Sequence, residues 1–426
     1  MSDTIFALSS GSPPAGIGVL RISGPAAAAA LQALAGAMPP PRVAKLRLLR
    51  HPSDAAPLDR ALILWFPGPA TVTGEDLAEL HCHGGRAVIV AVEEALAGLS
   101  GLRRAEAGEF TRRAFLNGKM DLNAVEGLAD LLAAETQQQR RTALLMTEGH
   151  FSRRLENWRL RLLQVSAMAE AALDFSDEDD VPDGSIEERI KDGIRELAEE
   201  VAAIRSAPSA ERLRDGIRVV LAGPPNAGKS TLLNRLVGRE AAIVSDIAGT
   251  TRDRVEVPAS LNGTAYLFTD TAGLRDETGD RIEAIGMDRA RDALAAADII
   301  LWLGPAEALP RADAILLAAQ SDRPSAARAG LRISAHSGEG MDELVALLGE
   351  RAGALLPGEG EYALHRRQRE GAEALEQHLK HAGDTSDLLV TAEELRQSRQ
   401  VIDQLTGQAG TEDMLDHLFA GFCIGK

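Results

Sequence analysis

The chain has 426 residues, enough for two to four domains, and 45% of them are hydrophobic, as in a folded protein. It has no apolar run of about 18 residues, no signal-peptide pattern at its N-terminus and only two distant cysteines, so we expect a cytoplasmic protein without a membrane segment or a disulfide framework. The net charge of −17 predicts that the molecule as a whole repels polyanions, so a nucleic acid must meet a local basic patch or a partner protein.

Residues 1–118 mix strand and helix patterns and predict an α+β domain. Within it, Glu79 begins an apolar strand that continues through His81, Cys82 and His83 into a glycine turn. A strand places both histidines on one face and the cysteine on the other. Because no further Cys or His lies at ligand spacing, a metal site is disfavoured, and a small-ligand pocket that includes the histidines and Glu79 is the better interpretation.

Residues 119–213 and 358–426 carry apolar side chains at helical spacing and predict two halves of one α-helical domain. The acidic segment 176–183 lacks the spacing of a calcium loop and is interpreted as a solvated turn. Between the two halves, residues 214–357 alternate strand and helix patterns, which predicts a doubly wound α/β domain inserted into the helical one.

A phosphate-binding loop is predicted at residues 223–231, Gly-Pro-Pro-Asn-Ala-Gly-Lys-Ser-Thr, between an apolar strand and a helix start. Glycines let such a loop point its N–H groups at phosphate oxygens, and the helix N-terminus adds partial positive charge. Lys229 would reach the β- and γ-phosphates, and Ser230 would ligate Mg²⁺. The alternative is a chance glycine-rich turn before a helix, which the Lys-Ser pair and the flanking segments disfavour.

Three further segments indicate a GTPase. Asp270-Thr271-Ala272-Gly273 would bring a carboxylate near Mg²⁺ and a glycine N–H near the γ-phosphate, and the threonines of Gly249-Thr250-Thr251 would form a switch. Ser334-Ala335 would offer a backbone N–H to guanine. Two departures stand out: Leu274 replaces the glutamine that orients water in many GTPases, and only Asp322 remains of the usual guanine-reading element, with a loss on the order of 1 kcal/mol for a missing hydrogen bond.

The chain resembles the MnmE (TrmE) family of tRNA wobble-uridine modification GTPases over nearly its full length. The resemblance rests on the phosphate loop and on segments 16–24, 73–85, 108–119, 246–253, 270–275 and the terminal Phe-Cys-Ile-Gly-Lys. It implies that the N-terminal domain carries homodimerisation and binds a 5-formyl- or methylene-tetrahydrofolate derivative. By motif position, the folate contacts fall on Arg21, Glu79, Lys119 and Lys426. Cys423 counts as functionally important in the family, although a buried apolar role is equally open.

The resemblance also implies GTP hydrolysis with K⁺ in place of an arginine finger. The K⁺ ligands would be Asn226, Ser245, Ile247 and Thr250, the Mg²⁺ ligands Ser230 and Thr251, and the catalytic residues Glu283, Lys229 and Thr251, with Glu277 as an alternative to Glu283. The nucleotide contacts fall on Asn226, Ala227, Gly228, Lys229, Ser230, Thr231, Ser245, Asp246, Ile247, Ala248, Gly249, Thr250, Thr251, Asp270, Thr271, Ala272, Gly273, Asp322, Ser334 and Ala335.

The implied function is addition of a carboxymethylaminomethyl-type group to C5 of the wobble uridine of certain tRNAs, with an FAD-containing MnmG-like partner in a heterotetramer. The alternatives are a ribosome-assembly GTPase and a non-catalytic scaffold. Folate binding would distinguish the implied function from a ribosome-assembly GTPase, and GTP turnover would distinguish it from a scaffold. Four arginine pairs are possible RNA-binding patches, although helix-surface arginines usually need no such role: Arg112-Arg113, Arg140-Arg141, Arg153-Arg154 and Arg366-Arg367.

Overall fold

The computed structural model describes residues 3–174, 183–238, 256–270, 290–319, 329–358, 360–407 and 412–426. The chain divides into two compact units, residues 1–129 with 403–426 and residues 130–402. No helix in these described ranges combines the length and the apolar character that crossing a bilayer requires. Most of the acidic segment 176–183 lies outside the described residues.

The first unit is built on a six-stranded sheet of order β3-β4-β5-β2-β1-β6. Neighbouring strands are antiparallel except for β1 and β6, which are parallel. The strands are β1 (Thr4–Leu8), β2 (Ile17–Ser23), β3 (Lys45–Arg50), β4 (Pro57–Phe66), β5 (Leu77–His83) and β6 (Leu102–Arg104).

Two helices, α1 (Ala27–Ala35) and α2 (Arg86–Ala97), pack on one face of this sheet. Alternation along the strands sends Leu20 and Leu80 into that core. Burying one such leucine contributes roughly 1.5–3 kcal/mol. The same alternation turns Arg21 and Glu79 to the opposite face, so the core pattern determines where the polar residues lie.

The C-terminal segment belongs to this first unit. Helix α14 (Glu412–Ala420) packs against α3 (Glu109–Leu116) and the start of α4 (Leu122–Ala133), and Phe419 and Phe422 enter a shared apolar cluster. Beyond α14, Ile424 forms an antiparallel bridge with Ala107. Residues at the two ends of the sequence therefore meet within one unit.

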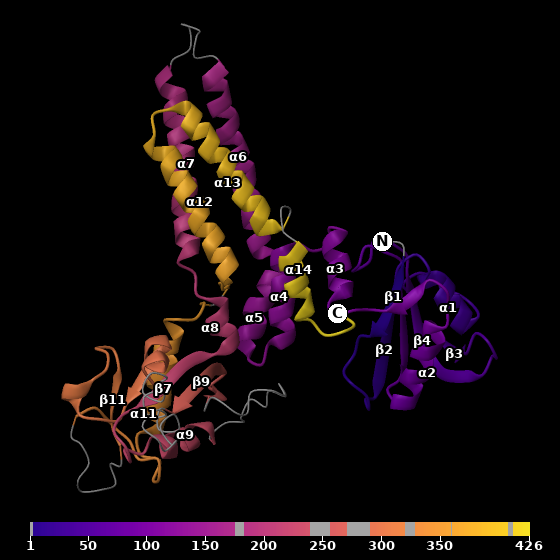
Figure 1. The fold of residues 1–426 in the computed structure, drawn as a ribbon, viewed down its shortest axis with the longest axis horizontal. Helices are drawn as coiled ribbons and strands as arrows, with labels where there is room; N and C mark the ends of the chain where they lie inside the picture. Colours follow the sequence, from indigo (N-terminus) through magenta and orange to yellow (C-terminus); the bar gives the residue numbers. More distant parts are fainter. Residues whose placement is uncertain are drawn as a thin grey trace, which may run out of the picture. The chain divides into compact units, whose positions relative to one another are not determined.

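The second unit contains a bundle of long helices. Trp158 of α6 donates its indole N–H to Glu200 of α7 at 3.0 Å, and Arg205 of α7 pairs with Glu376 of α12 at 2.7 Å. Helices that precede residues 214–357 in the sequence thus pack against helices that follow them (Figure 1). The helices are α5 (Gln137–Thr147), α6 (His150–Asp174), α7 (Asp183–Arg205), α12 (Arg366–Asp384) and α13 (Leu388–Thr406).

The rest of the second unit is a sheet of order β12-β11-β10-β7-β9-β8, parallel throughout except for the antiparallel edge strand β8. Helices α9 and α11 pack their apolar faces against it. Its elements are α8 (Ala210–Asp215), β7 (Ile217–Ala222), α9 (Lys229–Val237), β8 (Glu256–Leu261), β9 (Thr264–Asp270), β10 (Ile299–Trp302), η1 (Ala306–Ala308), β11 (Ile315–Ala318), β12 (Leu331–Arg332) and α11 (Met341–Gly353).

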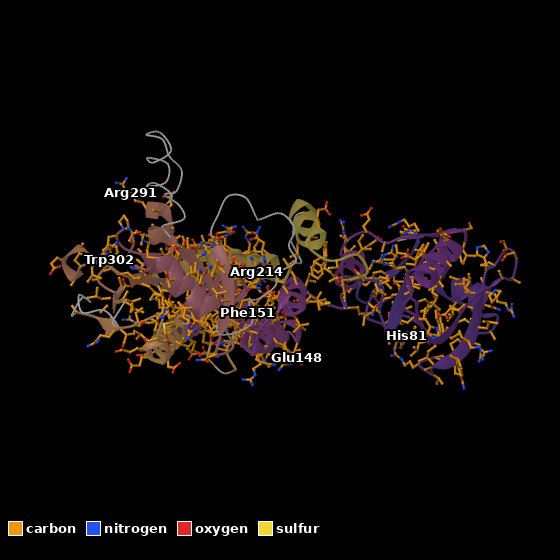
Figure 2. All side chains as sticks on the ribbon, turned by 90° about the horizontal axis from the view of Figure 1, so that it is seen from below. His81, Glu148, Phe151, Arg214, Arg291 and Trp302 are labelled. Atoms are coloured by element: carbon orange, nitrogen blue, oxygen red, sulfur yellow. The ribbon has the colours of Figure 1, made fainter. Side chains whose placement is uncertain are left out.

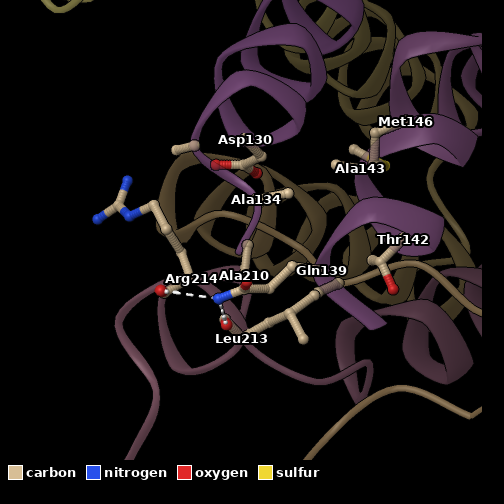
Figure 3. A pocket seen from close by; sticks show the side chains of 11 residues that line it. Asp130, Ala134, Gln139, Thr142, Ala143, Met146, Ala210, Leu213 and Arg214 are labelled. Atoms are coloured by element: carbon tan, nitrogen blue, oxygen red, sulfur yellow. Dashed lines mark hydrogen bonds between the residues drawn. The ribbon is translucent and has the colours of Figure 1, made fainter. Parts of the chain in front are cut away.

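The chain enters and leaves this α/β segment side by side, because Ser209 and Leu364 form a parallel bridge. Gln139 of α5 fixes the entry point: its side-chain amide donates to the carbonyls of Leu213 at 2.9 Å and Arg214 at 3.2 Å (Figure 3). The predicted fold class, an α+β domain, a helical domain and an inserted α/β domain, is confirmed. The boundaries at residues 118, 213 and 357 stay a prediction.

Candidate functional site

The predicted phosphate loop joins the end of β7 to the start of α9. Strand β7 lies between β9 and β10, so the loop emerges at the carboxyl edge of a parallel sheet, where such folds bind ligands. Gly228 caps α9 with φ +92°, a conformation that favours glycine. Asn226 has φ +60°, which Asn tolerates better than most residues. The loop therefore has the curled backbone that phosphate binding requires.

Lys229 is buried beside the loop, with 4% of its surface exposed. Its Nζ donates to the carbonyl oxygens of Gly223 at 3.1 Å and Pro224 at 2.9 Å. The side chain thus reaches back from the first turn of α9 across the loop. This arrangement holds a positive charge at the anion-binding end of the helix.

Ser230 and Asp270 meet next to the loop. Asp270 ends β9 in register with Leu221 of β7, so both strands deliver their carboxyl ends to the same place. The Ser230 hydroxyl donates to Asp270 Oδ2, and only 3% of Asp270 is exposed. A hydroxyl and a buried carboxylate are the hard oxygen donors that suit Mg²⁺.

The remaining nucleotide contacts are placed only in part. Thr231 lies in the first turn of α9, and Ser334 and Ala335 follow β12. The Ser334 N–H already donates to the Glu339 carbonyl at 2.9 Å, which makes Ala335 the better candidate for guanine. The other predicted residues lie outside the described ranges: Ser245, Asp246, Ile247, Ala248, Gly249, Thr250, Thr251, Thr271, Ala272, Gly273, Glu277, Glu283 and Asp322.

A second polar cluster lies on the face of the N-terminal sheet opposite α1 and α2. Glu79 Oε1 accepts hydrogen bonds from Arg21 Nε at 3.2 Å and Nη2 at 3.0 Å. Its other oxygen, Oε2, lies 3.1 Å from His81 Nε2 (Figure 2 labels His81). The Arg21 guanidinium also lies over the Phe110 ring, 5.9 Å from its centroid. Arg21 and Glu79, predicted together, are therefore in direct contact.

His83, the second histidine of the same strand, has a different partner. Its Nδ1 lies 2.7 Å from Asp59 Oδ1, and its N–H donates to Oδ2 at 2.8 Å. Burial would raise the pKa of Asp59, but the hydrogen bonds from His83 and from the Arg60 N–H outweigh it and lower that pKa. The two histidines thus bond to two carboxylates, and within the described part of the chain no group of three His, Cys, Asp or Glu residues is arranged to hold a metal.

Lys119 and Lys426 each lie beside a glycine that packs closely on another segment. Gly74, with φ +78°, lies so close to Asn117 and to the Lys119 side chain that a Cβ would collide with both. Gly425, with φ +96°, packs on the backbone of Leu8 and Ser9, and an added Cβ would come within 2.1 Å of the Leu8 carbonyl. The structure brings Lys119 to the 73–76 loop and Lys426 to the end of β1.

Two polar features at this sheet differ from anything that the sequence predicted. The Ser9 hydroxyl is buried and has no hydrogen-bond partner within the described residues. The Arg113 side chain is fully buried and bonds to Asp3, Glu75 and Glu109. The one sequence signal for the second feature is the i,i+4 spacing of Glu109 and Arg113.

The interpretation of Arg112-Arg113 as an RNA-binding patch is wrong. Arg113 is enclosed by carboxylates, and Arg112 pairs with Asp416 of α14 at 2.8 Å. The open role of Cys423 as a buried apolar residue is also wrong, because the cysteine is exposed; Cys82 is the buried one. For these arginines and cysteines, the surrounding residues and not the sequence motif determine whether the side chain is buried and what it binds.

The parallel sheet, the curled loop and the Lys229, Ser230 and Asp270 cluster define a P-loop nucleotide-binding protein. Residues 4–119 match the family model described as GTP-binding protein TrmE N-terminus, and residues 122–423 match the MnmE helical domain. The chain belongs to the family of the tRNA modification GTPase MnmE.

Relatives named tRNA modification GTPase MnmE match along their whole length. The protein of Rhizorhabdus wittichii is 58% identical, over 100% of this chain and 97% of its own. That of Novosphingobium aromaticivorans is 55% identical over 100% of both chains. That of Sphingopyxis alaskensis is 55% identical over 96% of this chain and 100% of its own.

Proposed function

We propose that the protein is a cytoplasmic, K⁺-stimulated GTPase that acts with an FAD-containing MnmG-like protein to add a carboxymethylaminomethyl-type group to C5 of the wobble uridine of certain tRNAs. The observation that carries the proposal is the phosphate loop with its Lys229, Ser230 and Asp270 cluster in a chain of this family. Full-length similarity disfavours a ribosome-assembly GTPase, because it includes the N-terminal sheet and the terminal Phe-Cys-Ile-Gly-Lys.

In this proposal the described residues bind and orient the triphosphate. Lys229 neutralises phosphate charge, and the N-terminal N–H groups of α9 donate to phosphate oxygens. Ser230 and Asp270 would hold Mg²⁺, which would supply positive charge next to the phosphoryl group. Thr251 would complete the Mg²⁺ ligands, and Glu283 would order the attacking water.

The K⁺ part of the proposal rests on Asn226. Asn226 lies in the bend of the loop with φ +60°, and its side-chain amide oxygen is the candidate K⁺ ligand among the described residues. Ser245, Ile247 and Thr250 would supply the other oxygens. A bound K⁺ supplies the positive charge that an arginine finger supplies in other GTPases.

The N-terminal cluster is the proposed site for a tetrahydrofolate derivative. Glu79 is an acceptor for ligand N–H groups, while Arg21, Lys119 and Lys426 are cations for ligand carboxylates. Ser9, whose buried hydroxyl has no hydrogen-bond partner within the described residues, has its Cα next to Gly425, the residue before Lys426. His81, whose Nε2 lies 3.1 Å from Glu79 Oε2, would form part of the same ligand pocket.

We propose a homodimer formed through the N-terminal domain. On the sheet face away from α1 and α2, Leu46 and Leu62 are direct partners across β3 and β4, and 58% and 38% of their surfaces are exposed. Apolar pairs of this kind favour contact with a second apolar surface. Two dimerised copies and their MnmG-like partners would make the heterotetramer.

Binding of 5-formyltetrahydrofolate tests the N-terminal site. Calorimetry on R21Q and E79Q should show affinity about tenfold to a hundredfold weaker, because each change removes charged hydrogen bonds of about 1.5–3 kcal/mol. R60Q, on the neighbouring strand β4, is the matched control and should bind normally. GTP hydrolysis should be unchanged in all three.

Formation of the modified nucleoside completes this test. With the MnmG-like partner and a tRNA substrate, R21Q should yield less product while R60Q yields the normal amount, measured by nucleoside mass spectrometry. Unaltered folate affinity in both R21Q and E79Q would contradict the assignment of this site.

A further inference from the structure

Several arginines on the surface of the helical bundle are neutralised by a carboxylate on their own helix. Arg159 pairs with Glu156, Arg195 with Asp192 and Arg396 with Glu393, each at 2.7 Å. Such exposed pairs contribute little to stability, about 0–1 kcal/mol. Their consequence here is electrostatic, because each cancels a positive charge on a surface whose overall charge is negative.

Around the turn between α5 and α6, four exposed arginines differ from this pattern: Arg140, Arg141, Arg153 and Arg154. Within the described ranges, no carboxylate lies within ion-pairing distance of any of them. Arg140 donates to the neutral amide of Gln137 at 3.1 Å, and Arg153 donates to the backbone carbonyl of Glu148 at 2.7 Å. We call these four residues the arginine surface.

The local sequence keeps this surface positive. Residues 137–155 contain all four arginines and one acidic residue, Glu148, in a chain whose net charge is −17. Arg154 interacts with Glu200, but that carboxylate already accepts hydrogen bonds from Arg161 and Trp158. The four guanidinium groups therefore keep donors available to an external anion.

The four arginines lie on two consecutive helices, close to the turn that joins them. Helices α5 and α6 are joined by the turn at Glu148 and Gly149, and Figure 2 labels Glu148 and Phe151 at this turn. Helix α5 buries Gln139, Thr142, Ala143 and Met146, so Arg140 and Arg141 lie on its outer side. At 1.5 Å per residue, the two arginine pairs lie within roughly 20 Å along the helices, the length of a few nucleotides.

We propose that the arginine surface binds the sugar–phosphate backbone of tRNA, an inference that rests on the proposed function. Guanidinium forks match phosphate oxygens in geometry and charge, and unpaired arginines incur no cost of breaking an ion pair on binding. Contacts of this type position an RNA without reading its sequence. Because the rest of the acidic molecule repels RNA, this surface sets where the RNA can lie.

The test is the salt dependence of tRNA binding to the full chain, measured by fluorescence anisotropy in a KCl series. R141Q/R154Q removes two of the charges and no hydrogen bond that holds the fold together. R195Q/R396Q is the matched control, since it changes the net charge equally but removes arginines that are already paired.

Each phosphate contact contributes about 0.7–0.9 to the slope of log K against log salt. R141Q/R154Q should therefore show a slope shallower by about 1.4–1.8. When KCl rises from 50 to 200 mM, the factor by which its affinity falls should be roughly ten times smaller than for the unaltered protein. R195Q/R396Q should match the unaltered protein. GTP hydrolysis should be the same in all three proteins.

Equal slopes for R141Q/R154Q and its control would overturn the inference and leave the proposed function standing if the unaltered protein binds tRNA. The inference would also be overturned if R141Q/R154Q bound RNA normally but no longer bound the MnmG-like partner. The arginine surface would then bind an acidic protein. No tRNA binding by the unaltered protein at 50 mM KCl would overturn the inference together with direct tRNA contact.

Discussion

At the scale of single residues, the neighbours decide what each reactive group does. Lys229 is held over the phosphate loop by two carbonyls, whereas Arg113 is enclosed by three carboxylates and serves the fold. The two cysteines differ in the same way. Burial raises the pKa of the Cys82 thiol to about 12, with a smaller contribution from Asp59, whereas Cys423 is exposed.

This difference predicts one reactive thiol per folded chain. A disulfide reagent at pH 8 should modify Cys423 and leave Cys82 unmodified, because only the thiolate attacks and the Cys82 thiolate is disfavoured by burial. The amount of thiolate that the reagent releases, measured before and after denaturation, reports the reactivity of Cys423 and of Cys82. C423S should give none until the protein is unfolded; rapid modification of folded C423S would contradict the structure.

Replacing Arg113 tests the buried network. R113M leaves the Glu75 carboxylate without its cation and Glu109 with Arg103 alone, and it should cost about 3–5 kcal/mol. Hydrogen exchange in β1 and β2 should report the loss as faster opening. R159Q, which breaks an exposed pair, should cost at most about 1 kcal/mol; an equally small effect of R113M would contradict the network.

The same network predicts a pH dependence. Burial would raise the pKa of Glu109, but hydrogen bonds from Arg103, the Glu106 N–H and Arg113 outweigh it and lower that pKa below 4.5. A lowered folded-state pKa gives stability that is full above pH 4.5 and is lost as pH falls through the folded value. The difference between R113M and the unaltered protein should therefore shrink in acid.

At the scale of elements, the sequence predicts the segments whose pattern is local. The phosphate loop with its flanking strand and helix, and the strand that carries Glu79 and His81, occur where predicted. Strand β8 was not predicted because Pro258 argues against a strand. An edge strand tolerates proline, and β8 lies at the edge of the sheet. Strand β6 has three residues, too few to show a period.

What the sequence could not predict is contact between distant segments. Arg21 and Glu79 are 58 positions apart, and only the pairing of β2 with β5 brings them together. The docking of Gly425 on Leu8 spans nearly the whole chain and depends on packing by Phe419 and Phe422. The family resemblance predicted that Arg21, Glu79 and Lys426 belong to a site, but only the structure shows which residues they contact.

At the scale of the whole molecule, charge is distributed unevenly. The chain carries −17, yet residues 137–155 contain four arginines and one acidic residue, whereas Arg21 of the N-terminal sheet is paired with Glu79. Helices before and after the α/β segment pack together, and Gln139 ties that packing to Leu213 and Arg214. The nucleotide site is thus joined through short connections to the bundle that carries the arginine surface.

The most direct test of the central claim is GTP hydrolysis at matched ionic strength in KCl and NaCl, with ATP as the control nucleotide. We expect strong stimulation by K⁺ with GTP alone. N226G keeps the φ of +60° accessible while it removes the amide, so it should bind GDP normally and hydrolyse GTP slowly in both salts. Equal, slow rates in KCl and NaCl for the unaltered protein would contradict the account.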